Sequence, residues 1–137
     1  MAESFNNYLT YAKYNAGAWK TIVPQAGGDI DNSIGVGSRL PNTTLQLHSI
    51  YITRETDGNH TSDPLSYASF VTLSIYDSGS EKSYSIANNV MVLPHSSCYI
   101  EKAITLTPQQ ELRLTYTSTN TGVSPNLHTI CSSVEIS

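Results

Sequence analysis

The four histidines are the side chains of this sequence best suited to hold a metal ion or to transfer a proton. They lie at positions 48, 60, 95 and 128, and no two have the H-x-H or H-x-x-x-H spacing of paired metal ligands. The nucleophile motifs G-x-S-x-G and C-x-x-C and a Gly-rich phosphate loop are absent. A Ser-His-Asp triad has no fixed order or spacing and stays open. The missing motifs nevertheless predict a protein that is not an enzyme, with no catalytic residues, no metal site and no cofactor.

One segment offers oxygen ligands at alternate positions, as the start of a calcium loop does. These are Asp29, Asp31 and Ser33. An EF-hand loop would continue with glycine at its sixth position and glutamate at its twelfth, where this chain has Ile34 and Leu40. We therefore expect a turn-rich loop, since Asp, Asn and Ser readily hydrogen-bond their own backbone.

The two cysteines, Cys98 and Cys131, are expected to be free thiols. Alternate residues of a strand face opposite sides of a sheet. Cys98 shares its side with Ile100 and is expected to face the core, whereas Cys131 shares its side with Glu135 and is expected to face outward. Side chains that point apart cannot form a disulfide without backbone movement.

Composition and charge argue against two classes of partner. The chain has 137 residues, enough for one domain with a real core, and only 13% of them are charged. A net charge of -4 without any Lys/Arg cluster argues against nucleic-acid binding. No apolar run is long enough to cross a membrane. The N-terminal segment MAESFNNYLTYAK lacks the basic and apolar regions of a secretory signal, so we expect none.

Aromatic side chains crowd the N-terminal segment, at Tyr8, Tyr11, Tyr14 and Trp19. Tyrosine and tryptophan are enriched at protein interfaces, so we predict that these four make interface contacts. A sugar-stacking platform and the outer layer of the sandwich are the alternatives. Residues 1–20 have apolar side chains at both helical and strand spacing. The β-rich remainder of the chain favours an extended N-terminal arm or a first strand.

The rest of the sequence alternates between short apolar runs and turns. Valine, isoleucine, threonine and tyrosine dominate these runs, which is typical of half-buried strands. About eight strands predict an all-β domain over residues 21–137, an antiparallel β-sandwich of jelly-roll or immunoglobulin-like type. In TTLQLHSIYIT the alternation changes phase near His48, which indicates a β-bulge or a strand buried on both faces. Asn88 and Asn89 indicate a turn or bulge in a later strand.

A long polar loop is predicted over residues 54–66, with the sequence RETDGNHTSDPLS. Loops of this length on compact sheets are more often functional or interfacial than decorative. We therefore predict that the loop contacts a partner through Arg54, Asp57, Asn59 and His60.

The order of segments from residue 19 onward resembles a family of small bacteriophage virion proteins. The matching segments are WKTIVP, LHSIYIT, VTLSIYDSGSE, VMVLPHSSCYIEKAITL, ELRLTYTS and a terminal VEI. Together they cover most of residues 19–136. The family usually has a tight turn leading into the central strand, whereas residues 24–44 form a longer insertion here, and the loop at 54–66 is also long.

The resemblance implies a non-enzymatic structural component of a bacteriophage particle, a capsid decoration, neck or tail protein that acts through protein–protein contacts. It also implies a homo-oligomer, other virion proteins of the capsid, neck or tail as partners, and a location in the virion after assembly in the host cytoplasm. Neutral polar loops and exposed tyrosines leave an alternative from another class, a carbohydrate- or receptor-binding module of a tail fibre.

Overall fold

The computed structural model describes residues 3–12, 19–30, 35–54, 68–93, 96–118 and 127–137. In this part of the chain every regular element is a strand, which confirms the all-β prediction. No membrane-spanning helix is found among the described residues. The strands are β1 (Glu3–Ala12), β2 (Lys20–Val23), β3 (Gly35–Val36), β4 (Thr44–Arg54), β5 (Ser69–Asp77), β6 (Lys82–Val92), β7 (Ser97–Ile100), β8 (Ile104–Leu106), β9 (Gln110–Ser118) and β10 (Leu127–Ile136).

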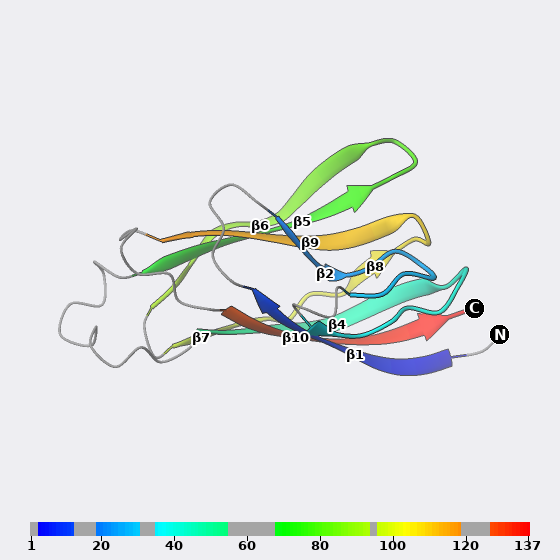
Figure 1. The fold of residues 1–137 in the computed structure, drawn as a ribbon, viewed down its shortest axis with the longest axis horizontal. Coiled ribbons are helices and arrows are strands. Elements are labelled where there is room, and N and C mark those ends of the chain that lie inside the picture. The colour runs from blue at the N-terminus through cyan, green and yellow to red at the C-terminus, as the bar shows by residue number, and fades with distance from the viewer. Residues whose placement is uncertain (1–2, 13–18, 31–34, 55–67, 94–95, 119–126) are drawn as a thin grey trace.

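The strands form two antiparallel sheets that lie face to face (Figure 1). One sheet has the order β3-β1-β10-β4-β7, with β8 also pairing β4, and the other has the order β2-β9-β5-β6. The pairs are nested along the chain: β1 with β10, β2 with β9, β4 with β7 and β8, and β5 with β6. A long hairpin rolled into two sheets in this way is a jelly roll. Of the two predicted sandwich types, the jelly roll is therefore the one present.

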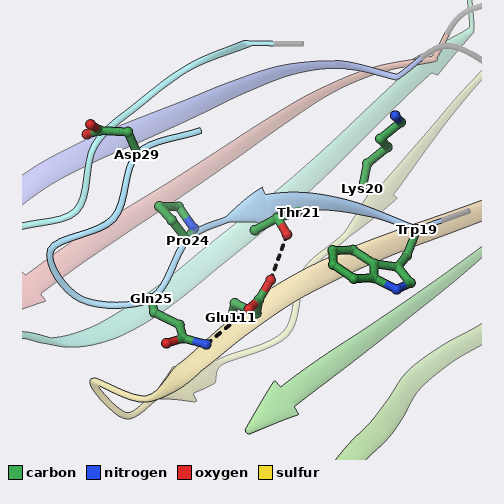
Figure 2. A pocket seen from close by; sticks show the side chains of 7 residues that line it. All are labelled: Trp19, Lys20, Thr21, Pro24, Gln25, Asp29 and Glu111. Carbon is green, nitrogen blue, oxygen red and sulfur yellow. Dashed lines mark hydrogen bonds between the residues drawn. The ribbon is translucent and has the colours of Figure 1, made fainter. Parts of the chain in front are cut away.

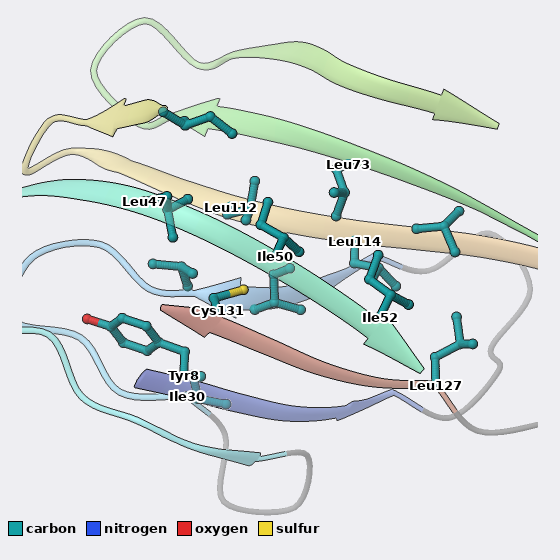
Figure 3. Close-up of a cluster of buried hydrophobic side chains, with 14 of the residues drawn as sticks. Tyr8, Ile30, Leu47, Ile50, Ile52, Leu73, Leu112, Leu114, Leu127 and Cys131 are labelled. Carbon is teal, nitrogen blue, oxygen red and sulfur yellow. The ribbon is translucent and has the colours of Figure 1, made fainter. Parts of the chain in front are cut away.

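The core lies between the sheets and follows the alternation of the sequence (Figure 3). Leu112, Leu114 and Tyr116 of β9 are buried, while Arg113 between them lies on the opposite face of the sheet. The phase change in β4 is a β-bulge at His48, because the pairing of β4 with β10 shifts register at that point. The predicted bulge is confirmed.

Short-range hydrogen bonds shape the β5–β6 hairpin. Asp77 Oδ1 accepts the backbone N–H of Gly79 at 2.8 Å and that of Ser80 at 3.3 Å, which is the Asx-type turn expected of these residues. The pairing of β6 with β5 shifts register around Asn88 and Asn89, and Asn89 has a φ of 51°. An asparagine tolerates this left-handed conformation better than most residues, which fits the predicted bulge.

Residues 3–12 of the N-terminal segment form a strand of the larger sheet. All ten residues of β1 pair with β10, so residues 3–12 belong to the same domain as the rest of the described chain. Tyr8 points from β1 into the core and is 0% exposed. Gly37 packs so closely on its ring that an added Cβ would come within 2.6 Å of Tyr8 Cδ1. The ring is thus part of the interior, and not of a free arm.

A buried carboxylate explains why the predicted orientation of Cys131 was wrong. The Tyr8 hydroxyl donates a hydrogen bond to Glu135 Oε1, and the backbone N–H of Leu40 donates to Glu135 Oε2 at 3.4 Å. Glu135 therefore faces inward, and Cys131, four residues earlier on the same face of β10, is buried as well. Treating Glu135 as a solvent-facing residue had reversed the assignment of the two faces of β10.

Among the residues that the structure describes, Arg39 is the largest fully buried side chain, and it joins the two sheets at one end. Its Nη1 donates to the carbonyls of Pro24 and Gln110, which flank β2 and β9 of one sheet. Its Nη2 donates to three more carbonyls, which flank β4 and β8 of the other sheet: Thr43 at 2.7 Å, Leu106 at 3.0 Å and Thr107 at 2.9 Å. We call this set of five bonds the Arg39 clamp.

The guanidinium keeps its charge inside the protein. Burial lowers the pKa of Arg39, and the electrostatic effects of Tyr8 and Glu135 raise it in partial compensation. Because an arginine starts from a very high pKa, it remains protonated at neutral pH. The cation and the buried Glu135 carboxylate thus offset each other in the interior.

Arg39→Met is expected to lower the free energy of unfolding by about 3–5 kcal/mol, because five carbonyls lose a donor and Glu135 keeps a buried charge. Urea unfolding followed by circular dichroism measures this change. Lys102→Met is the matched control, since Lys102 Nζ also donates to a carbonyl, that of Ile86, but at the surface; it is expected to change stability by less than about 0.5 kcal/mol. Equal effects of the two changes would contradict the clamp.

Candidate binding site

A pocket of about 430 Å³ lies beside β2 and the start of β9 (Figure 2). Its volume is in the range of small-molecule sites, which span roughly 300–1,000 Å³. Most of the wall comes from β2 and the turn that follows it. The strand ends before Pro24, because proline has no backbone N–H to donate. The lining residues are Trp19, Lys20, Thr21, Pro24, Gln25, Asp29 and Glu111.

Glu111 forms the inner wall and is held by three neighbours. Thr21 Oγ1 donates to Glu111 Oε2 at 2.6 Å, and Gln25 Nε2 donates to Oε1 at 3.0 Å. Arg113 Nε donates to Oε2 at 3.2 Å and completes an ion pair. A carboxylate engaged in this way is a fixed structural group. It sets the shape of the pocket and leaves ligand contacts to the other side chains.

Trp19 is held by a stacked arginine. The Arg113 guanidinium carbon lies 3.6 Å from the centroid of the Trp19 ring and 3.7 Å from that of Tyr76. A cation between two aromatic faces is attracted by both ring quadrupoles. Trp19 remains 51% exposed, so the stack fixes an indole at the mouth of the pocket while leaving much of its surface open.

Two further side chains bring opposite charges to the pocket. Lys20 Nζ and the Asp29 carboxylate make no side-chain hydrogen bond or ion pair with the rest of the described chain. Figure 2 shows them well apart on the rim. An aromatic surface, a cation, an anion and the Gln25 amide thus border one cavity. Such a set suits binding of a small ligand that has a ring face and several polar groups.

The four aromatic residues predicted to make interface contacts do not share one environment in the structure. Trp19 is exposed and lines the pocket, whereas Tyr8 is buried in the core and presents no surface to a partner. Tyr11 pairs with His128 in the backbone of β1, and its side chain is outside the described structure, as is all of Tyr14. Of the four predicted aromatic contacts, Trp19 is thus the one whose described side chain is open to a partner or ligand.

Of the four predicted loop contacts, the structure describes Arg54 alone. Arg54, the first residue of the predicted loop, is instead the last residue of β4, and its side chain is buried. It therefore does not make the surface contact predicted for it. Asp57, Asn59 and His60 lie outside the described residues.

Sequence reasoning overlooked Lys20, Glu111 and Arg113 as site residues. The available signal was the polar face of the run ELRLTYTS, on which glutamate and arginine are two residues apart. That spacing puts them on one side of a strand, but only the pairing of β9 with β2 shows that this side adjoins Trp19. Among the described residues no group of three or more His, Cys, Asp or Glu side chains could hold a metal ion.

No protein-family model and no curated protein sequence matches the chain. Solved structures match its fold. The Gx strain of infectious bursal disease virus gives a TM-score of 0.52 at 10% identity over 99% of this chain and 33% of that one. The T13 particle of this virus gives a TM-score of 0.55 at 12% identity over 98% of this chain and 31% of that one. The Gt strain gives a TM-score of 0.53 at 11% identity over 98% of this chain and 32% of that one. The chain thus spans about a third of each matching chain, and the likeness is one of fold.

The two thiols are expected to differ in reactivity. Both are free; Cys131 is buried and Cys98 half-buried. Burial raises the pKa of Cys131 to about 12 and also raises the pKa of Cys98, and the thiolate is the reactive form. Iodoacetamide near pH 8.5 should therefore add one group to the native protein, at Cys98, and two in denaturant, as measured by intact mass. Cys98→Ser should leave the native protein unlabelled; labelling of that variant would contradict the buried position of Cys131.

Proposed function

We propose that this protein is a non-enzymatic structural component of a virus particle and acts through protein–protein contacts. The observation that carries the proposal is the jelly-roll pairing of the strands, together with a fold likeness to virus structures over 98% or more of the chain. Jelly rolls with this double-sheet arrangement are common in viral capsid domains. The matching chains are about three times as long, so this chain corresponds to one part of such a protein.

We further propose that the particle is a bacteriophage and that the protein is a capsid decoration, neck or tail component. The order of strands and turns from residue 19 onward, which resembles small bacteriophage virion proteins, supports this assignment. The partners would be other virion proteins and further copies of the chain, with assembly in the host cytoplasm. A surface with few charges and many hydroxyl groups is compatible with such wet, neutral contacts.

The protein is expected to be present in purified particles of the virus that encodes it. Density-gradient purification followed by a salt wash and quantitative mass spectrometry tests this, with the major capsid protein as the internal standard. A fixed copy number per particle that survives the wash is the expected result, since subunit contacts on a particle are saturated by symmetry. Recovery only in the soluble fraction of infected cells would contradict the proposal.

A second candidate function is glycan binding, and the pocket beside Trp19 is the observation that favours it. Sugar rings stack their C–H faces on indole surfaces, while their hydroxyl groups exchange hydrogen bonds with carboxylate, amide and ammonium groups. Trp19 offers the stacking surface, and Asp29, Gln25 and Lys20 offer the polar contacts. A structural role on a particle and a glycan contact are compatible in one protein.

Because the chain contains a single tryptophan, its fluorescence reports this pocket alone. Titration with galactose, glucose, mannose and N-acetylneuraminic acid is expected to give a saturable shift of Trp19 emission with one of them. Asp29→Asn should weaken that response at least tenfold, because a hydrogen-bonded carboxylate is worth more than about 1.4 kcal/mol in such a site. Tyr84→Ser on the distant β6 should leave it unchanged. A flat titration with all four sugars would remove this candidate.

A further inference from the structure

Four exposed apolar side chains form one continuous row across the larger sheet. Leu9 on β1 is paired with Ile130 on β10, Ile130 with Tyr51 on β4, and Tyr51 with Tyr99 on β7. Directly paired residues of antiparallel strands point to the same face. The neighbours of these residues, such as Tyr8 and Cys131, are buried, so the row lies on the face turned away from the core. We call it the apolar row.

The exposure of this row is unusual for a folded monomer. Its four side chains are between 38% and 57% exposed. Single apolar residues on a surface are normal, but a contiguous apolar patch marks an interaction site. Phe5, on the same face of β1 but separated from Leu9 by Asn7, is 87% exposed.

Polar residues border the row on both sides. On one side Asn7 is paired with Ser132, and Ser132 with Ser49. On the other side His128 is paired with Thr53, and Thr53 with Ser97. An apolar centre with a polar rim is the anatomy of a protein interface.

The hydroxyl group of Tyr51 is already engaged at this rim. Side-chain hydrogen bonds with Ser97 and Thr53 lower the pKa of Tyr51. Tyr51 is 38% exposed, and its ring offers an apolar contact surface. None of the residues named in the row or its rim is Asp, Glu, Lys or Arg. The residues named in the row and its rim therefore bring no charge to a contact.

We propose that the apolar row is the contact between two copies of this chain, packed face to face about a two-fold axis. The axis runs parallel to the strands, between β10 and β4. This rotation reverses the order of the row in the second copy. Leu9 and Ile130 of one copy therefore face Tyr99 and Tyr51 of the other. A two-fold contact must be self-complementary, and the division of the row into an aliphatic and an aromatic half meets that condition.

The size of the face fits the same partner. β1, β10 and β4 have ten, ten and eleven residues, and β7 and β8, which both pair with β4, have four and three. At a strand spacing of about 4.8 Å and about 3.4 Å per residue these strands cover roughly 600 Å². Stable complexes bury about 600–1,000 Å² on each partner. The face of the sheet is thus large enough for a dimer without help from other elements. This inference rests on the proposed function, because it names one of the protein–protein contacts that assembly would use.

Light scattering coupled to size-exclusion chromatography, at concentrations up to about 100 µM, tests the contact, since interfaces of this size have Kd values of about 1 µM or tighter. The wild type is expected to be a dimer. Tyr99→Ser should weaken the dimer at least tenfold, because tyrosine is a frequent hot-spot residue. Tyr84→Ser is the matched control: Tyr84 is 52% exposed and Tyr99 57%, but Tyr84 belongs to the other sheet. It should leave the dimer intact.

A charge-exchange experiment tests the orientation. Leu9→Lys and Tyr99→Glu should each abolish the homodimer, and their mixture should form a heterodimer, because the axis places Leu9 of one copy opposite Tyr99 of the other. Circular dichroism of each variant confirms folding. A monomeric wild type, equal effects of Tyr99→Ser and Tyr84→Ser, or a mixture that stays monomeric would overturn the inference. None of these results affects detection of the protein in purified particles, so the test of the proposed function is independent of the test of the dimer.

Discussion

The Arg39 clamp is the interaction on which the geometry of the remaining structure depends. Hydrophobic packing brings the two sheets together, but it is non-directional and does not fix how their ends meet. A planar guanidinium with several donors can do so. By bonding carbonyls beside β2 and β9 and others beside β4 and β8, Arg39 closes one end of the sandwich. The insertion that contains it is therefore a structural element of the domain.

The clamp also positions the candidate binding site. Two of its acceptors, the carbonyls of Pro24 and Gln110, immediately adjoin the pocket residues Gln25 and Glu111. These two side chains hydrogen-bond each other, so the wall of the pocket is continuous with the clamp. The jelly roll, the buried cation and the pocket thus form one connected arrangement, in which a rigid interior supports a polar surface cavity.

The sequence predicted what depends on local alternation and failed where a polar residue is buried. Leu112 and Leu114 face the core in line with the alternation of the sequence, and the bulge at His48 was visible as a change of phase, because both follow from the two-residue period of a strand. Tyr8, Arg54 and Glu135 broke the rule that polar or amphipathic side chains face outward. For Tyr8 and Glu135 the burial depends on a partner that is distant in sequence, since the two residues are 127 positions apart. Pairing of this kind, like the choice of jelly roll, is not encoded in any local pattern.

The apolar row illustrates the same limit from the outer surface. Each of its residues looks unremarkable in its own strand, since one exposed leucine or tyrosine is common. Only the register of β1, β10, β4 and β7 shows that they are neighbours. Folding alone does not account for the row, because side chains on this face add little to the core, and exposed apolar surface favours unwanted association. A contact with another subunit, in which that surface is buried, accounts for both its composition and its place on the sheet.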